Sequence, residues 1–425
     1  MIVPQRRTPL QRVYLRILAA LPACLWVAVA LPTFSGSDAA SPTPAPALIL
    51  DRHALAGAKQ RTQSGDPSLM AALDKLRREA DRALSQAVGS VTEKKTLPPS
   101  GDRHDYMSTA PYWWPNPNTA DGLPYLRRDG NVNPERDLVS DRNRLAQMIQ
   151  GVKTTALGYY FLQRDAYADH AAKLMRAWFL DHRTRMSPHL RYAQAIPGRN
   201  HGRAAGIIET HDFPDLLDAA GLLAGAKAWQ HSDQKGLRDW FSHYLNWLVD
   251  SAEGRAEAKA QNNHGSWYDV QVACFARFVG QDQLANKVLA EFARHRVARQ
   301  IEPDGRQPYE LGRTQAWNYS IFNLAAFFSA AGLGDKLGID LWSYETPDKR
   351  SLRRALDWLT PFATGEQNWS HQQITKVQRE KLAPLLRRAA LSYREPAYEN
   401  AIAKLVNING DERWQLLYPR MLERQ

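Results

Sequence analysis

Gln261 to Asp269 reads QNNHGSWYD and leads directly into a helical pattern. Apolar residues then recur at the spacing of one helix face, at Trp267, Val270, Cys274, Phe275 and Phe278. Two amides and an imidazole therefore stand at the start of a buried helix. Asn is a favoured helix cap, and capping needs only one side-chain oxygen. This accounts for either Asn262 or Asn263 and leaves the other Asn and His264 without a structural explanation.

Two other polar segments stand at the starts of apolar helices, at nearly equal distances along the sequence from His264. One lies near His211 and the other near Asn318, 53 residues before and 54 residues after His264. Each interval fits two helices and two connections, so we expect equivalent helices in consecutive helical hairpins. Hairpins repeated around a ring would bring these helix starts to one end of an α/α toroid. An open solenoid of helix pairs is the structural alternative.

Helical periodicity dominates the rest of the chain. Asp66 is placed as a cap and Pro67 as the first residue of a helix with an apolar stripe that extends to Leu84. Similar stripes lie within residues 167–178, 237–248 and 382–393. The sequence therefore predicts an all-α fold, an (α/α) toroid or incomplete barrel of helical hairpins in one domain.

The N-terminus has the pattern of an export signal. Four arginines precede an apolar run over residues 17–34, and small residues at Ser37 and Ala39 suit a signal peptidase. We expect a signal peptide at residues 1–39, with an uncleaved anchor or lipidation at Cys24 as alternatives. A Pro-rich linker and N-terminal segment would follow at 40–60, and the α/α toroid domain at 61–425. The expected location is the periplasm or the exterior, without stable membrane association after cleavage.

Composition narrows the class of protein. With 44% apolar and 23% charged residues, the 425-residue chain is an ordinary globular protein. Cys24 and Cys274 are its two cysteines, so loss of the leader leaves no intrachain disulfide. The net charge of +11 suits an anionic ligand, although it also fits a soluble surface. Scattered basic residues disfavour nucleic-acid binding.

Three further segments carry candidate site residues. Glu310 to Asn323 (ELGRTQAWNYSIFN) places a cation, Arg313, and a phenol, Tyr319, near a helix start. Tyr106 to Pro117 (YMSTAPYWWPNP) concentrates aromatic residues where no regular stripe can bury them, as expected for stacking on sugar rings or for a hydrophobic plug. Pro197 to Pro214 adds polar residues before the helix near Phe213. The substrate-binding candidates are Tyr112, Trp113, Trp114, Arg203, His211, Asn262 and Tyr268.

Together with DGLPYLRRDGNVNPE at 121–135, these segments resemble the alginate-lyase superfamily of polysaccharide lyases. The resemblance spans roughly residues 102–323 and implies an α/α toroid that cleaves a uronate polysaccharide. It assigns the catalytic positions to Asn263, His264, Arg313 and Tyr319. The Arg-to-Tyr interval is six residues here, where seven is usual in the best-known branch.

Cleavage of a 4-linked uronate begins with removal of the C5 proton beside an ionised carboxylate. Asn263 and Arg313 suit the task of offsetting that charge. Tyr319 can take the proton and protonate the leaving O4 when both lie on one face, provided that nearby cations lower its pKa from about 10. For the epimer with its proton on the opposite face, His264 is the better base.

This scheme requires no cofactor or metal, and the sequence has no HExxH or paired-Cys pattern. A metal set of His201, His211 and His264 is the alternative. The rival functions are a glycoside hydrolase, which would draw two carboxylates from Glu209, Asp212, Glu302 and Asp304, and a non-catalytic glycan-binding protein. For a lyase, alginate, especially polymannuronate, and glucuronan are both suitable substrates, because each presents a 4-linked carboxylated ring. The sequence leaves endo or exo action and the oligomeric state open.

Overall fold

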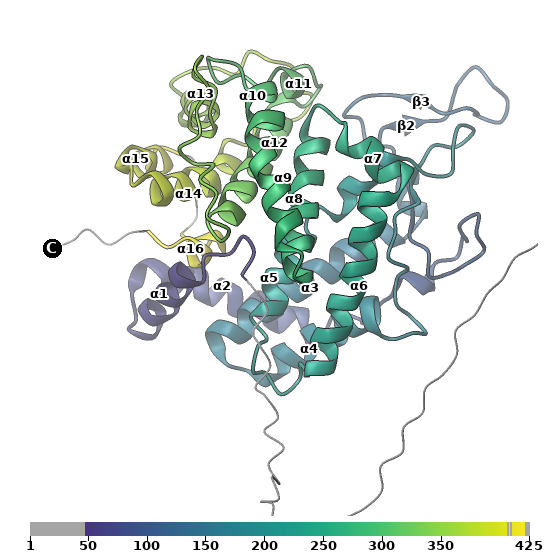
Figure 1. Cartoon of the computed structure of the whole chain (residues 1–425), viewed down its shortest axis with the longest axis horizontal. Coiled ribbons are helices and arrows are strands. Elements are labelled where there is room, and N and C mark those ends of the chain that lie inside the picture. Colours follow the sequence, from purple (N-terminus) through teal and green to yellow (C-terminus); the bar gives the residue numbers. More distant parts are fainter. Residues whose placement is uncertain (1–46, 406–407, 409, 421–425) are drawn as a thin grey trace, which may run out of the picture. The chain divides into compact units, whose positions relative to one another are not determined.

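The computed structural model describes residues 47–405, 408 and 410–420 (Figure 1). The predicted signal peptide lies outside the described residues, as does linker 40–46. The α-helices are α1 (Arg52–Gln63), α2 (Pro67–Ala83), α3 (Asp141–Leu162), α4 (Asp165–Met175), α5 (Phe213–Gly221), α6 (His231–Asp250), α7 (Ala252–Ala258), α8 (Asn263–Val279), α9 (Asp282–Phe292), α10 (Ala298–Gln300), α11 (Pro308–Leu311), α12 (Ala316–Gly334), α13 (Leu352–Thr364), α14 (Ala383–Tyr393), α15 (Pro396–Ala403) and α16 (Trp414–Leu417).

Short strands and turns of other helix types connect them. The strands are β1 (Met107–Thr109), β2 (Trp113–Trp114), β3 (Leu126–Arg127) and β4 (Tyr192–Ala195). Parallel β1 and β4 form one pair, and antiparallel β2 and β3 form the other. The 3₁₀ turns are η1 (Val91–Glu93), η2 (Pro134–Leu138), η4 (Ala204–Thr210) and η6 (Arg379–Leu382), and the π turns are η3 (Arg176–Leu180) and η5 (Ala293–Val297).

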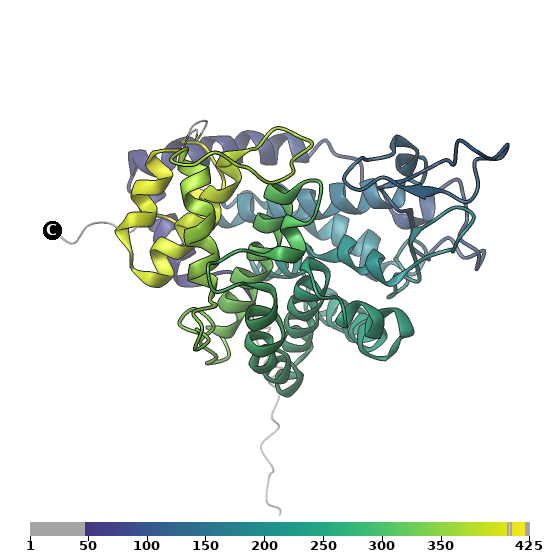
Figure 2. The same ribbon diagram turned by 90° about the horizontal axis from the view of Figure 1, so that it is seen from above.

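The central helices follow the predicted repeat. Helices α3, α5, α8 and α12 contact one another in that order, with α4 on α3, α9 on α8 and α13 on α12 (Figures 1 and 2). Helices α8 and α12 are buried around most of their circumference, as expected for helices inside a ring of outer partners. Helices α5, α8 and α12 begin at Phe213, Asn263 and Ala316, close to the predicted positions.

The contacts also return to their starting point. Helix α14 contacts α12, and its Arg387 lies over Trp414 of α16. Helix α16 contacts α2, which packs on α3. This closed circuit confirms the predicted α/α toroid. None of the helices in the described part of the chain is both long and apolar enough to span a membrane.

Local sequence signals were confirmed at several helices. Asp66 caps α2 by accepting a hydrogen bond from the Ser68 amide, and Pro67 is its first residue. The late stripe begins in η6 and continues through α14. Two features add to what the sequence predicted. Helix α1 begins inside the segment assigned to the linker and N-terminal region, and the Pro-broken aromatic stretch forms β1 and β2.

The described N-terminal segment is fixed to the central helices by one carboxylate. Asp218 on α5 accepts hydrogen bonds from the backbone amides of Leu48, Ile49 and Leu50, at 2.9, 2.8 and 2.8 Å. Burial raises the pKa of Asp218 to about 6, against the effect of these three bonds. The position of residues 48–50 therefore depends on the buried carboxylate of Asp218.

Replacement of this anion should destabilise the fold. In Asp218→Asn, an amide group would face backbone N–H donors, leaving buried donors unpaired, so we expect a loss of about 2–4 kcal/mol in the free energy of unfolding. Urea denaturation at a pH well above the Asp218 pKa measures this loss. Asp239→Asn, which removes an exposed partner of Lys235, is the control and should change stability by less than about 0.5 kcal/mol. Equal stability of the two variants would contradict the anchoring role.

Candidate active site

One cavity of about 810 Å³ gathers most of the predicted site residues. Its walls come from α3, β2, β4 and η4 on the N-terminal side, and from the starts of α8 and α12. Nine of the eleven candidates line it: Tyr112, Trp113, Arg203, His211, Asn262, Asn263, His264, Arg313 and Tyr319. The three polar segments that the sequence places at nearly equal intervals, near His211, His264 and Asn318, therefore meet at one cavity.

Two substrate-binding candidates do not line this cavity. Trp114 follows Trp113 on a strand, and successive strand side chains point to opposite faces. Its indole N–H donates to the Asn131 carbonyl at 3.0 Å. Tyr268 is buried on α8, where its hydroxyl donates to the Leu248 carbonyl at 2.8 Å. The structure therefore gives both residues structural contacts and places neither among the residues that line the cavity.

The two asparagines at the start of α8 have different tasks. Asn262 caps the helix by accepting from the His264 amide. Asn263 is buried and gives both its backbone N–H and its Nδ2 to the Glu310 carboxylate, at 2.6 and 2.7 Å. Burial raises the pKa of Glu310, although these bonds oppose the rise. Glu310 thus orients Asn263 and leaves its second amide hydrogen for another acceptor.

His264 is oriented by a second carboxylate. Its Nδ1 lies 2.5 Å from Oε1 of Glu257, a side chain that is only 4% exposed. Because an ionised carboxylate only accepts hydrogen bonds, Nδ1 must carry a proton. The other ring nitrogen, Nε2, is then the atom that can exchange a proton with a ligand.

Arg313, Tyr319 and Tyr112 form a compact group. The Tyr319 hydroxyl accepts from Arg313 Nη2 at 2.8 Å and lies 2.7 Å from the Tyr112 hydroxyl. The Arg313 guanidinium carbon lies 3.9 Å from the centre of the Tyr319 ring. Arg313 precedes α12 and Tyr319 lies in its first turn. The six-residue interval therefore brings the two side chains into direct contact.

A third carboxylate fixes this group. Asp129, which follows β3, accepts from Nε and Nη2 of Arg313 and from the Thr314 amide. Burial opposes ionisation of Asp129, but the bonds from Arg313 and Thr314 hold its pKa well below its usual range. Burial also acts to lower the pKa of Arg313, and Asp129 outweighs it, so that the pKa rises. The pair is therefore charged.

The condition set for Tyr319 as a base is not met in the free protein. Burial raises the pKa of Tyr319, and Arg313 offsets only part of the rise. Tyr319 therefore holds its proton in the free protein.

The three orienting carboxylates were missed in the sequence. Asp129 and Glu310 belong to quoted segments, but no spacing signal connects them or Glu257 to the residues that they contact. Further cavity residues that were missed are Arg127, Arg142, Gln194, Gln315, Asn318 and Lys381.

The residues that a glycoside hydrolase or a metal site would need are only partly brought together. Of the four carboxylates available to a hydrolase, Glu302 and Asp304 lie outside the cavity, and Glu209 and Asp212 line it. Burial acts to raise the pKa of Asp212, but Lys153 at 3.4 Å outweighs it and lowers the pKa, which is unsuited to a general acid. Within the described ranges, no group of three or more His, Cys, Asp or Glu could hold a metal ion.

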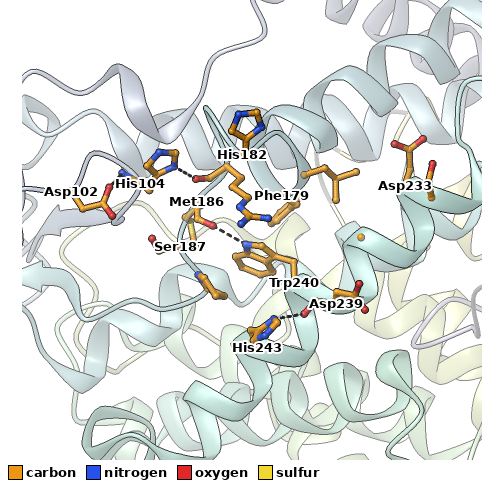
Figure 3. A pocket seen from close by; sticks show the side chains of 15 residues that line it. Asp102, His104, Phe179, His182, Met186, Ser187, Asp233, Asp239, Trp240 and His243 are labelled. Atoms are coloured by element: carbon orange, nitrogen blue, oxygen red, sulfur yellow. Dashed lines mark hydrogen bonds between the residues drawn. The ribbon is translucent and has the colours of Figure 1, made fainter.

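A second cavity, of about 680 Å³, contains none of the eleven candidates (Figure 3). It lies between residues 179–188 and α6. Several of its polar groups are engaged with backbone carbonyls: His104 with Arg185, Trp240 with Met186, and His243 with Asp239. The convergence of polar side chains is greater in the first cavity.

Removal of Glu310 tests its orienting role. Glu310→Ala leaves the buried Asn263 amide groups unpaired, so we expect a loss of about 2–3 kcal/mol in the free energy of unfolding. Glu291→Ala on α9 is the control, because Glu291 forms a half-exposed pair with His295 of η5. It should cost less than about 0.5 kcal/mol beyond helix propensity. A Glu310 variant as stable as this control would contradict the assignment.

Comparisons with known proteins identify the family of the chain. The family model described as Alginate lyase matches residues 90–369. A crystal structure of an alginate lyase from Bacteroides ovatus has 39% sequence identity and a TM-score of 0.85, covering 88% of this chain and 99% of that chain. Alginate lyase A1-III from Sphingomonas species A1, at 14% identity and a TM-score of 0.59, covers 90% of this chain and 98% of its own, and supports the fold alone.

No curated protein matches the chain. The family match spans well over half of its length. The chain belongs to the alginate lyase family and is a polysaccharide lyase whose substrate is an anionic polysaccharide.

Proposed function

We propose that this protein cleaves a 4-linked uronate polysaccharide, of the polymannuronate or glucuronan type, by β-elimination. The observation that carries the proposal is the Tyr319 hydroxyl, bonded to both Arg313 and Tyr112 in the cavity that Asn263 and His264 also line. A titratable oxygen, a cation, an amide and an oriented imidazole are the groups that C5 proton removal and O4 departure require.

Neutralisation of the substrate carboxylate is the first requirement. Asp129 occupies Nε and Nη2 of Arg313, which leaves Nη1 for the substrate. Glu310 takes one hydrogen of Asn263 Nδ2, which leaves the other. Both donors are already oriented, so they can stabilise the enolate-like dianion without reorganisation.

Tyr319 supplies the proton chemistry. Because burial raises its pKa, the free protein holds a neutral phenol that can protonate O4. To act first as the base, Tyr319 must lose its proton, and bonds donated by Arg313 and Tyr112 would stabilise the phenolate. His264, with Nδ1 given to Glu257, offers Nε2 as the base for the epimer whose C5 proton lies on the opposite face.

The cavity is large enough for several sugar residues, because its volume lies near the upper end of the range for small-ligand sites. Alginate lyase A1-III has been solved with a tetrasaccharide. We propose that an oligosaccharide stretch occupies this cavity, with Trp113 as a stacking surface.

Single substitutions test the chemistry. With purified mannuronate, guluronate and glucuronate polymers, we expect an unsaturated product seen as rising ultraviolet absorbance. Tyr319→Phe and His264→Ala should each lower turnover by about 10²–10⁴-fold, since each removes a proton-transfer or charge-stabilising group. Tyr309→Phe, at an exposed tyrosine outside the cavity, is the control. Full activity in Tyr319→Phe would contradict the assignment.

The rival functions give different products. A hydrolase would release reducing ends without unsaturated sugar, and a binding protein would leave the polymer length unchanged. Either result with the unmodified chain would overturn the proposed reaction.

We also propose that residues 1–39 direct export and that the protein acts in the periplasm or outside the cell. The arginine-led apolar run and the small residues before Ala40 support this. Expression with the native N-terminus should give a mature chain beginning near Ala40, as determined by N-terminal sequencing of the periplasmic fraction. Intact Met1 in a cytoplasmic product would contradict export.

A further inference from the structure

The proposed catalytic groups are divided between two helices. Asn263 and His264 are the first residues of α8, and Tyr319 lies in the first turn of α12. The two helices pack against each other (Figure 1). A sugar ring in the cavity must meet groups from both helices at once, so the offset between α8 and α12 decides whether they act on the same ring. A misplacement of about 1 Å can lower the rate of an enzyme about 100-fold.

A buried cluster of uncharged side chains connects the beginning of α8 to α12. We call it the amide cluster, and it consists of Ser266, Gln300, Gln307 and Asn323, each at most 2% exposed. These four residues lie outside the cavity lining. Ser266 belongs to α8 and Asn323 to α12, whereas Gln300 is the last residue of α10 and Gln307 directly precedes α11. The cluster therefore joins four segments of the chain.

Asn323 is the centre of the amide cluster. Its Nδ2 donates to Oε1 of Gln300 at 3.0 Å and to Oε1 of Gln307 at 2.9 Å, which uses both amide hydrogens. The same oxygen of Gln300 accepts from the Ser266 hydroxyl at 3.0 Å. Nε2 of Gln307 donates to the Ser320 carbonyl at 3.1 Å. One side-chain amide thus fixes α12 directly against α10 and the start of α11, and through Gln300 against α8.

Short paths lead from the amide cluster to the proposed catalytic groups. The residue before α11 belongs to the cluster, and Glu310 of α11 holds the Asn263 side chain. Ser266 lies two residues after His264 in the same turn of α8. On α12, the cluster holds the carbonyl of the residue that directly follows Tyr319. Both helix starts therefore depend on the same four side chains.

The polar character of the cluster points to a task beyond stability. Apolar side chains would hold α8 and α12 together without the loss of hydration that burial of amide groups costs. Farther along α12 the buried residues Leu324, Phe327 and Phe328 are of this kind. Apolar attraction is not directional, whereas a hydrogen bond is satisfied only within a few tenths of an ångström. Amide groups at the cavity end therefore fix the offset of the two helices more closely than apolar packing would.

We propose that the amide cluster sets the offset between α8 and α12, and that Asn323 is the positioning residue that holds Tyr319 in register with Asn263 and His264. Asn323 acts through the backbone of α12 and does not touch the substrate. This inference rests on the proposed function, because it assumes that groups of both helices act on one uronate. Loss of Asn323 then lowers turnover by enzyme that is still folded.

Asn323→Leu tests the positioning role, because it nearly keeps the side-chain volume and removes both donated bonds. On the polyuronate that the unmodified chain cleaves, we expect kcat to fall about 10–100-fold and KM to change less than about threefold, since the reacting groups are misplaced while the cavity wall is retained. Rates are measured by ultraviolet absorbance at temperatures where circular dichroism shows each variant to be folded.

Tyr398→Phe is the matched control. It also removes a hydrogen bond of a buried side chain, from the Tyr398 hydroxyl to Asp357 at 2.7 Å, but it does so between α15 and α13 and away from the cavity. We expect a lower melting temperature with kcat unchanged. If Asn323→Leu does not fold, Ser266→Ala, which removes one bond to Gln300, replaces it, with an expected fall in kcat of about threefold to tenfold.

A double substitution separates positioning from general damage. Residues that act as a unit have non-additive effects. In a Tyr319→Phe background, where the positioned hydroxyl is absent, Asn323→Leu should lower the residual rate much less than it does in the unmodified chain. A purely structural role for Asn323 would lower both rates by the same factor. That result would overturn the proposal, as would a kcat of Asn323→Leu equal to that of Tyr398→Phe.

The two proposals fail separately. If the unmodified chain produces no unsaturated sugar from any polyuronate, the proposed function fails. If it does so while the Asn323 variant turns over like the control, the lyase reaction stands and only the positioning role is wrong.

Discussion

Ionised carboxylates that are buried or partly buried behind the proposed catalytic groups are the constraint on which this site depends. Removing such a charge from water is costly unless donors surround it. Glu310 meets this requirement with two bonds from Asn263, Asp129 with Arg313 and Thr314, and Glu257 with His264. Few positions satisfy the hydrogen bonding of each carboxylate. Each carboxylate therefore fixes the position of one group at the cavity wall.

This arrangement connects the fold to the site. Glu310 lies on α11 and Asn263 opens α8, so their bonds tie consecutive repeats together at the end where the cavity forms. Asp129 similarly joins the β2–β3 hairpin to the residues that precede α12. The pairs that orient the proposed catalytic side chains are thus also contacts between successive elements of the toroid. Loss of one pair would change both stability and geometry.

The sequence predicted the fold better than the site. Helix stripes and the 53- and 54-residue intervals depend on local spacing, and these predicted the inner helices and the shared cavity. The carboxylate partners depend on contacts between positions such as Glu310 and Asn263, 47 residues apart, which no local pattern encodes. Trp113 and Trp114 show the same limit, because alternation along β2 sends only one of them into the cavity. A Pro-broken stretch did not predict that strand.

The raised pKa of Tyr319 also follows from this architecture. The ring is stacked under Arg313, and its hydroxyl is bonded within a buried wall, so burial opposes the phenolate more strongly than one cation favours it. Asp129 contributes to this, because its negative charge also opposes the phenolate. An anionic substrate alone would add to the opposition. In the proposed mechanism, Asn263 and Arg313 therefore neutralise the substrate carboxylate before Tyr319 acts as a base, which couples correct binding to proton transfer.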